Sequence, residues 1–247
     1  MTAQIEVRGL TMAYGASVVQ RDLSFTIERG QIFVIMGDSG CGKSTLMRHM
    51  IGLNAPAAGD VYYDGEAYWE QDGDRREALG HKFGVLYQSA ALFSSMTIEE
   101  NVSLPLIEHA GLSRSASRDV ASLKLALVGL SGFEEHYPAE VSGGMRKRAG
   151  LARAMALDPD ILFFDEPSAG LDPLSSRRLD DLIRELRDSA GTTIVLVTHE
   201  LPSIFELGDD AVFLDAERKT MIARGEPNAL KQSSDAKVRA FLNRDRL

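Results

Sequence analysis

A glycine-rich stretch from Gly37 to Thr45 carries the clearest chemical signal in the chain. The apolar run Gln31–Met36, which has the pattern of a buried strand, leads directly into it. Glycines let such a loop turn its backbone N–H groups inward, and the positive end of the following helix faces the same point. We therefore expect a phosphate cradle, with lysine on the outer phosphates and a serine hydroxyl on Mg²⁺. The G-x-x-x-x-G-K-[ST] spacing is supplied by Gly37, Gly42, Lys43 and Ser44.

Phosphate binding is assigned to the whole loop. Cys41 lies inside it and is the only cysteine of the chain. It is either a reactive thiol or a small residue at a variable position, and the second interpretation is favoured. A single cysteine allows no internal disulfide, which favours a reducing compartment. The predicted contact residues are Gly37, Asp38, Ser39, Gly40, Cys41, Gly42, Lys43, Ser44 and Thr45.

A second chemical group follows the apolar run Ile161–Phe164. Asp165 and Glu166 stand where this buried strand would reach the carboxyl edge of a parallel sheet, the edge at which ligands bind. Asp165 suits Mg²⁺, shared with Ser44, and Glu166 could polarise an attacking water. The alternative is a solvated turn before Pro167, which becomes the weaker interpretation once a phosphate loop lies upstream.

Two further polar residues end apolar strands. Gln88 follows Phe83–Tyr87, and His199 follows Thr193–Val197. Gln88 could contact the metal or the water, and the histidine could donate to an outer phosphate. Each is a weak signal alone, because a polar residue that caps a strand has the same pattern.

A second glycine-rich helix start lies at Ser142, Gly143 and Gly144. Ser142 is placed as an N-cap, and such a helix start is again an anion site. Either one molecule grips phosphates at both helix starts, or a second molecule completes each site. The basic side chains that follow are a solvated helix face or part of the anion site, and they are Arg146, Lys147, Arg148 and Arg153.

The surrounding pattern indicates an α/β fold. Weak alternation over Ile5–Phe25 and the turn at Asp64-Gly65 predict antiparallel strands. From Ser89 to Asp158 the periodicity becomes helical, with a capping box at Thr97, so a helical subdomain of about residues 89–158 is inserted between core strands. Later strand–helix–strand order predicts a parallel core sheet. The last residues, 226–247, are polar with one weak apolar rhythm.

Composition excludes several classes of protein. The 247 residues carry a net charge of −9, which disfavours nucleic acid as the main partner. The N-terminus lacks a signal pattern, and no apolar run approaches the roughly 18 residues of a membrane span. We expect one large domain over residues 1–225, followed by a tail.

Taken together, the motifs resemble the nucleotide-binding subunits of ABC transporters along nearly the whole chain. The loop Gly37–Thr45 is similar to Walker A, Val141–Met145 to the signature motif and Ile161–Glu166 to Walker B. Gln88 resembles the Q-loop glutamine and His199 the switch histidine. Tyr14 resembles the aromatic residue that stacks on the base, although pattern alone leaves a core role equally open. Ser168–Asp172 matches the D-loop.

Met145 stands where most members of this family carry glutamine. That departure, the following Arg-Lys-Arg-Ala and the stretches Tyr87–Pro105 and Asp235–Leu242 resemble ATPases of Mla/Mce-type phospholipid transporters.

The resemblance implies a RecA-like P-loop core and a peripheral position on the cytoplasmic face of the inner membrane. Two copies would bind head to tail around two ATP–Mg²⁺ molecules, each ATP between the Lys43 loop of one copy and the Ser142 helix start of the other. Glu166, His199 and Gln88 would serve catalysis, and Ser44, Gln88 and Asp165 the metal. Implied partners are permease subunits, an Mce-domain protein and a small STAS-type subunit, and the tail would contact a neighbouring copy.

Three other functions are compatible with the sequence. An ABC ATPase for a lipoprotein or an amino acid would carry the same motifs. A non-transport ATP-driven clamp usually joins two ATPase units, whereas this chain has one set of motifs and an acidic balance. A plain P-loop kinase would leave Ser142–Met145 without a role.

Overall fold

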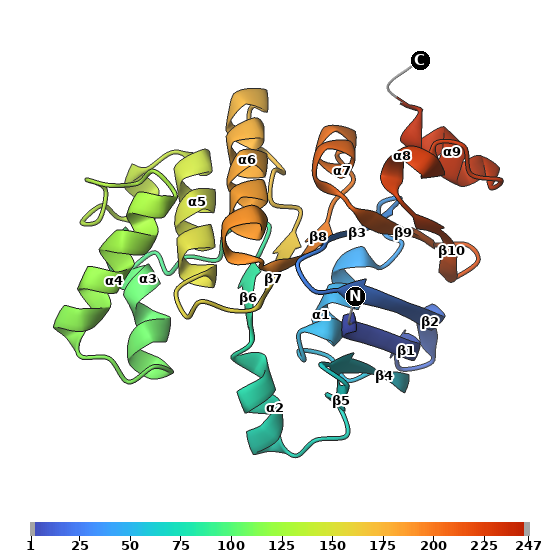
Figure 1. Ribbon diagram of the computed structural model, residues 1–247, viewed down its shortest axis with the longest axis horizontal. Coiled ribbons are helices and arrows are strands. Elements are labelled where there is room, and N and C mark those ends of the chain that lie inside the picture. Colours follow the sequence, from blue (N-terminus) through green and yellow to red (C-terminus); the bar gives the residue numbers. More distant parts are fainter. Residues whose placement is uncertain (1–2, 245–247) are drawn as a thin grey trace.

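The computed structural model describes residues 3–244 and contains two sheets with helices around them (Figure 1). The smaller sheet is antiparallel, in the spatial order β2 (Ser17–Glu28), β1 (Ala3–Tyr14), β4 (Ala58–Tyr63) and β5 (Glu66–Ala67). The larger sheet has the order β10 (Thr220–Gly225), β9 (Asp210–Asp215), β3 (Ile32–Gly37), β8 (Thr193–Val197), β7 (Ile161–Asp165) and β6 (Phe83–Leu86).

The antiparallel strands predicted near the N-terminus and around Asp64-Gly65 are confirmed. Tyr63 of β4 pairs with Glu66 of β5 across a two-residue turn. Both turn residues have positive φ, +51° for Asp64 and +84° for Gly65. A turn of that kind matches the twist of a hairpin, which explains why Asp-Gly was a useful signal.

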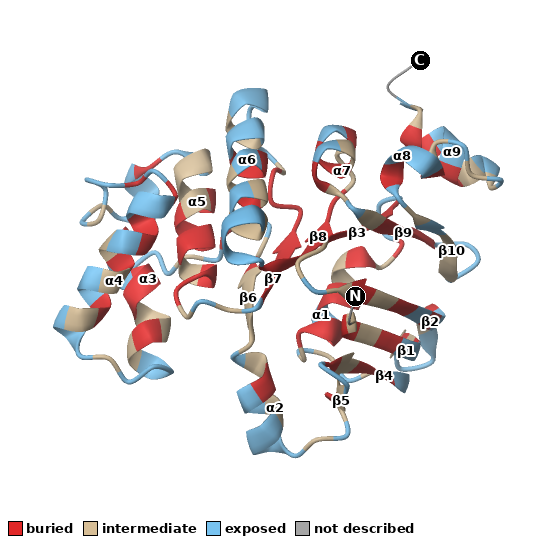
Figure 2. Ribbon diagram, viewed as in Figure 1, coloured by how far each residue is buried: buried red, intermediate tan, exposed pale blue. Residues whose placement is uncertain are grey.

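The parallel core sheet is also confirmed, because β6, β7, β8, β3 and β9 all pair in parallel. Strands β3, β7 and β8 are buried at every position (Figure 2). Both faces of this sheet are covered, which is why these strands read as continuous apolar runs. Only β10 pairs antiparallel within the larger sheet.

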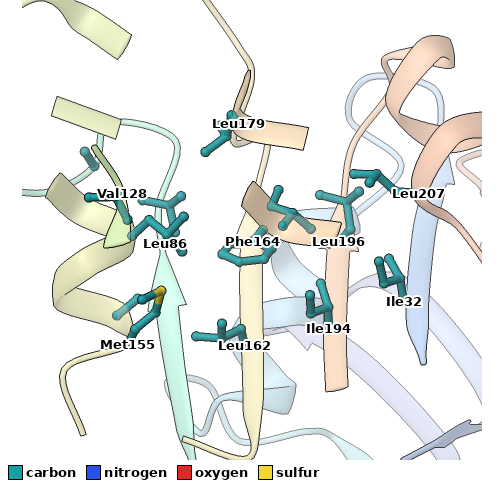
Figure 3. Close-up of a cluster of buried hydrophobic side chains, with 14 of the residues drawn as sticks. Ile32, Leu86, Val128, Met155, Leu162, Phe164, Leu179, Ile194, Leu196 and Leu207 are labelled. Carbon is teal, nitrogen blue, oxygen red and sulfur yellow. The ribbon is translucent and has the colours of Figure 1, made fainter. Parts of the chain in front are cut away.

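Alternate side chains of the parallel strands enter two different cores. Ile32 and Phe164 pack toward the helices, in the cluster of Figure 3. Their neighbours Phe33 and Phe163 pack on the opposite face, against the antiparallel sheet and helix α1 (Lys43–Met50). The core sheet is therefore held rigidly from both sides, and its carboxyl edge is a fixed platform.

Helices dominate the segment between β6 and β7, as the periodicity predicted. The capping box at Thr97 is present, with Glu100 N donating to Thr97 Oγ1 at 3.1 Å. Pro105 lies inside the helix that Thr97 caps. The elements of this segment are α3 (Ile98–Glu108), α4 (Arg114–Leu127), η1 (Pro138–Glu140) and α5 (Gly143–Ala154).

The remaining helices flank the core sheet and end the chain (Figure 1). No helix within residues 3–244 combines the length and the apolar character that crossing a bilayer requires. Apart from α1, these helices are α2 (Gly73–Gly80), α6 (Pro173–Ala190), α7 (Leu201–Leu207), α8 (Pro227–Leu230) and α9 (Ala236–Leu242).

Candidate functional site

The glycine loop joins the end of β3 to the start of α1. Gly37 has φ of +146°, and a Cβ there would lie 2.4 Å from Leu214 O. Gly42 caps the helix at φ +101°. Only glycine fits the first position without moving backbone, and it relieves strain at the second. The loop therefore depends on both glycines for its shape.

Lys43 closes this loop on itself. Its Nζ donates to Gly37 O at 2.9 Å and to Asp38 O at 3.2 Å, and the residue is only 7% exposed. The loop tip from Asp38 to Gly40 is exposed, whereas Cys41 is buried, and burial raises the pKa of its thiol. The ammonium group is thus held above an open cradle of main-chain atoms, where an anion could replace its carbonyl partners.

Two of the three side chains assigned to the metal lie together. Ser44 Oγ donates to Asp165 Oδ1 at 2.7 Å, although 121 residues separate them in the chain. Ser44 lies in the first turn of α1, and Asp165 ends β7, so the contact joins the loop to the carboxyl edge of the sheet. A hydroxyl and a carboxylate at this edge are hard oxygen donors, which suit Mg²⁺.

Glu166 has an unusual backbone. Its φ is +47°, and its N–H donates to Val197 O at 2.8 Å, so the end of β8 holds this strained conformation. Glu166 Oε1 lies 2.8 Å from His199 Nδ1. The other carboxylate oxygen, Oε2, is buried and has no hydrogen-bond partner among the described residues. A buried acceptor without a partner fits a role toward a water or a ligand.

Gln88 and Asp165 line one pocket, together with Tyr87, Arg48 and Gly170. The structure therefore brings Gln88 to the same edge as the metal donors, as the pattern of strand ends suggested. The side chain of His199 is 45% exposed, and it is linked to that edge by its contact with Glu166.

Tyr14 lies outside both cores. Its ring is 55% exposed, and its hydroxyl accepts from Asn54 Nδ2 at 3.2 Å. Of the two roles left open by the sequence, that of a core aromatic residue is wrong. An exposed ring remains available for stacking on a base.

The second glycine-rich helix start differs from the first. Ser142 and Gly143 are exposed, and Ser142 Oγ accepts from Met145 N at 3.2 Å, as an N-cap does. Within residues 3–244, the only hydrogen bond of the Ser142 side chain is this one in its own helix. The described chain therefore does not bring Ser142, Gly143 and Gly144 to the phosphate loop.

The interpretation of the basic residues of α5 as a solvated helix face is wrong, and their part in an anion site stays a prediction. Each donates to main-chain carbonyls instead. Burial lowers the pKa of Lys147, Arg148 and Arg153. The pairs are Arg146 with Val141 O, Lys147 with Glu166 O, Arg148 with Val128 O, and Arg153 with Ala90 O and Ala91 O.

Two of these contacts bear on the site, and the sequence did not single them out. Lys147 Nζ lies 3.4 Å from Glu166 O, so α5 supports the strained residue. Arg153 holds Ala90 and Ala91, both at positive φ, just after Gln88. Their partners are far away in the chain, and no local pattern signals them.

The C-terminal tail touches the site as well. Lys237 Nζ lies 2.6 Å from Asp215 Oδ2 and 3.7 Å from Asp38 Oδ2, so α9 is tied to the phosphate loop. Arg244 donates to His199 O. The weak apolar rhythm predicted for the tail is what packs it, since Phe241 lies edge-on to Phe213.

Comparison with known proteins identifies the family to which this chain belongs. A family model described as ABC transporter matches residues 20–169. That span includes the phosphate loop, Gln88, the Ser142 helix start and both carboxylates.

The curated relatives cover almost all of the chain. The probable ribonucleotide transport ATP-binding protein mkl of Mycobacterium bovis is 41% identical over 247 residues, which is 100% of this chain and 68% of the relative. The intermembrane phospholipid transport system ATP-binding protein MlaF of Escherichia coli K12 is 39% identical over 239 residues, 97% of this chain and 88% of the relative.

Solved structures agree on the fold. One is the dimeric post-hydrolysis state of the ATP-binding cassette MJ0796 bound to ADP and Pi, with TM-score 0.82, 28% identity and coverage of 90% of this chain and 98% of that one. The cbiO1 protein from Clostridium perfringens reaches TM-score 0.85 over 100% of this chain and 97% of that chain, and at 23% identity it supports the fold alone. With loop, carboxylates and relatives in agreement, the chain belongs to the ABC transporter family as an ATP-binding subunit that hydrolyses ATP.

Proposed function

We propose that this ATPase powers phospholipid transport of the Mla/Mce type, from the cytoplasmic face of the inner membrane. The observation that carries the proposal is 39% identity to MlaF of E. coli K12 over 97% of this chain. A second MlaF, from Haemophilus influenzae, is 37% identical over 96% of it. The likeness spans the ATPase motifs and the tail alike.

In this proposal the phosphates of ATP lie on Gly37–Thr45, with Lys43 on the outer phosphates and the exposed ring of Tyr14 on the base. Ser44, Asp165 and Gln88 would hold Mg²⁺, and the bound ion would supply charge neutralisation at the phosphates. The fit rests on the exposed main-chain cradle and on the hydroxyl–carboxylate pair at 2.7 Å.

Glu166 holds the attacking water and accepts its proton. Its free Oε2 is the acceptor, and its Oε1 contact with His199 fixes the orientation of the carboxylate. His199, 45% exposed on its side chain, would face the outer phosphate. Both residues sit on main chain that β8 anchors, so their geometry is set before the nucleotide arrives.

Each pocket is completed by a second copy, head to tail. The support is the exposure of Ser142 and Gly143, which have no ligand in their own chain among residues 3–244. The backbone N–H groups at the start of a helix can bind an anion. The related cassette MJ0796 is dimeric in its solved structure. The tail, residues 226–247, adds a contact between copies.

Permease subunits dock beside Gln88 and the helical segment. A groove there has mostly apolar walls, including Phe83, Val85, Phe93 and Leu104. Movement of the Gln88 segment, clamped by Arg153, would reach the permease by this route. Further partners are an Mce-domain protein and a STAS-type subunit.

Ribonucleotide transport is the second candidate, because the mkl relative named for it is 41% identical. Cargo is chosen by the permease and not by the ATPase, so the two candidates share one mechanism. Purification with the co-expressed permease, followed by analysis of bound lipids and nucleotides, separates them. Phospholipid enriched over a permease-free control supports the proposal, and nucleotide cargo without lipid rejects it.

Replacing Glu166 with Gln tests the hydrolytic step. We expect ATP binding to persist, turnover to fall about a hundredfold or more, and an ATP-bound dimer to accumulate on light scattering. Glu185→Gln, an exposed change on α6, is the matched control and should keep the wild-type rate. Wild-type turnover in Glu166→Gln would remove this residue from its role.

A further inference from the structure

A cluster of metal-ligating side chains lies away from the phosphate loop. Glu77, His81 and His109 each offer one ligand atom, and these atoms all lie within 4.8 Å of one another. The two imidazole rings are 4.9 Å apart between centroids. All three residues are exposed, so an ion can reach them from solvent.

Two helix ends build this cluster. Glu77 lies on α2 and His81, four residues later, is the C-cap of this helix, so the two residues share one face. His81 N donates to Glu77 O at 3.2 Å, which keeps the helical geometry through that position. His109 follows α3, and its N–H donates to Pro105 O at 3.0 Å. In Figure 1 the C-terminal end of α3 faces the end of α2 that leads into β6.

Nearby basic side chains are engaged elsewhere. Arg75, two residues before Glu77, forms an ion pair with Glu66 at 2.5 Å. Lys82, directly after His81, pairs with Asp64 at 3.0 Å. These pairs leave the Glu77 carboxylate to the two histidines.

We propose that Glu77, His81 and His109 form a Zn²⁺ site that ties α2 to α3. Two imidazoles and one carboxylate are a ligand set that zinc accepts, with a water in the fourth position. Zinc–ligand bonds of about 2.0–2.2 Å need ligand atoms roughly 3.3–3.5 Å apart. Small rotations of exposed side chains supply that closure. Mg²⁺ and Ca²⁺ prefer oxygen ligands, so they do not compete well here.

A bound ion would act on the moving part of the molecule. Helix α2 leads directly into β6, which ends two residues before Gln88, while α3 belongs to the helical segment. His81 and His109 also line the groove assigned to the permease. The zinc site itself does not depend on that assignment, because it is built only from this chain.

The test is calorimetric titration of the tag-free, nucleotide-free full chain with ZnCl₂. We expect one site per chain, and Co²⁺ in place of zinc should give the visible absorption of a four- or five-coordinate ion. Losing one ligand, in His109→Ala or Glu77→Gln, should weaken zinc binding more than the roughly 10- to 100-fold that loss of an outer-shell partner costs. Zinc should raise the melting temperature of the wild-type chain and not that of His81→Ala.

Matched controls separate this site from the phosphate-loop edge. His136→Ala and His199→Ala remove the other accessible histidines, and both should keep the one-site zinc isotherm. Retention of wild-type zinc affinity in the double variant His81→Ala/His109→Ala would overturn the proposal. Loss of binding in His199→Ala alone would do so too, because it would place the ion at the catalytic edge.

Discussion

Two helix starts in this protein are rich in glycine but have different surroundings. At α1, Lys43 is 7% exposed and bonded to its own loop, and Ser44 contacts Asp165. At α5, Ser142 is exposed and serves only as its own helix cap among the described residues. The first helix start contacts its partner residues within its own chain, and the second faces solvent.

The difference teaches what a helix start requires to become a site. Both starts offer N–H groups and a positive helix end. Only α1 also has a sheet edge with carboxylates beside it, namely Asp165 and Glu166. The α5 start has the anion-binding half without the catalytic half, which is the arrangement expected if a second copy supplies the rest.

The buried start should be the more sensitive of the two. In Lys43→Ala the ammonium that spans the loop is lost, and we expect ATP turnover to fall about a hundredfold or more. Steady-state ATPase assays measure this, and far-UV circular dichroism checks that the fold persists. Turnover within twofold of wild type would contradict the cradle.

At the exposed helix start, we expect ATP turnover to fall only when a substitution introduces a negative charge. Ser142→Asp keeps a good N-cap but brings a carboxylate to the predicted phosphate, and like charges about 4 Å apart repel by about 4 kcal/mol at an effective dielectric constant of 20. We expect turnover to drop roughly tenfold or more in ATPase assays, with an unchanged melting temperature.

Ser142→Asn is the matched control, because it caps equally well without charge. It should stay much closer to wild type than the aspartate. Equal rates for both variants and the wild-type chain would mean that no phosphate approaches this helix.

Thiol labelling should separate the two starts by accessibility. Cys41 is 1% exposed and burial raises the pKa of its thiol, so less of the reactive thiolate is present at pH 7. A cysteine introduced by Ser142→Cys should react with a maleimide about tenfold faster or more. In the Glu166→Gln background, ATP should slow labelling of the introduced cysteine. Labelling that ATP leaves unchanged would contradict coverage by a partner.

Many features of the two helix starts could be predicted from the sequence, because the patterns that indicate them are local. The glycine spacing, the capping residues Thr97 and Ser142, and the Asp64-Gly65 turn depend on a few neighbouring residues. Asp165 and Glu166 follow a run that is apolar because both faces of its strand are covered. Such features survive in a single sequence because backbone geometry demands particular residue types.

Other features depend on distant partners and could not be predicted. Helix α2 has only a weak apolar pattern, with Leu79 as its single buried residue. The carbonyl contacts of Lys147 and Arg153 and the tail contact of Lys237 join residues far apart in the chain. A basic residue in a helix has the same local pattern whether it faces water or a buried carbonyl.

Mixing two inactive variants tests most directly whether each pocket is shared between copies. Lys43→Ala damages one half of every pocket, and Ser142→Asp damages the other half. In a head-to-tail heterodimer both defects meet in one pocket, and the other pocket is intact. Equal mixing should therefore restore roughly a quarter of wild-type ATPase activity, since half of the dimers carry one intact pocket of two. If the mixture is no more active than the two variants measured separately, each chain binds ATP alone and the shared pocket is wrong.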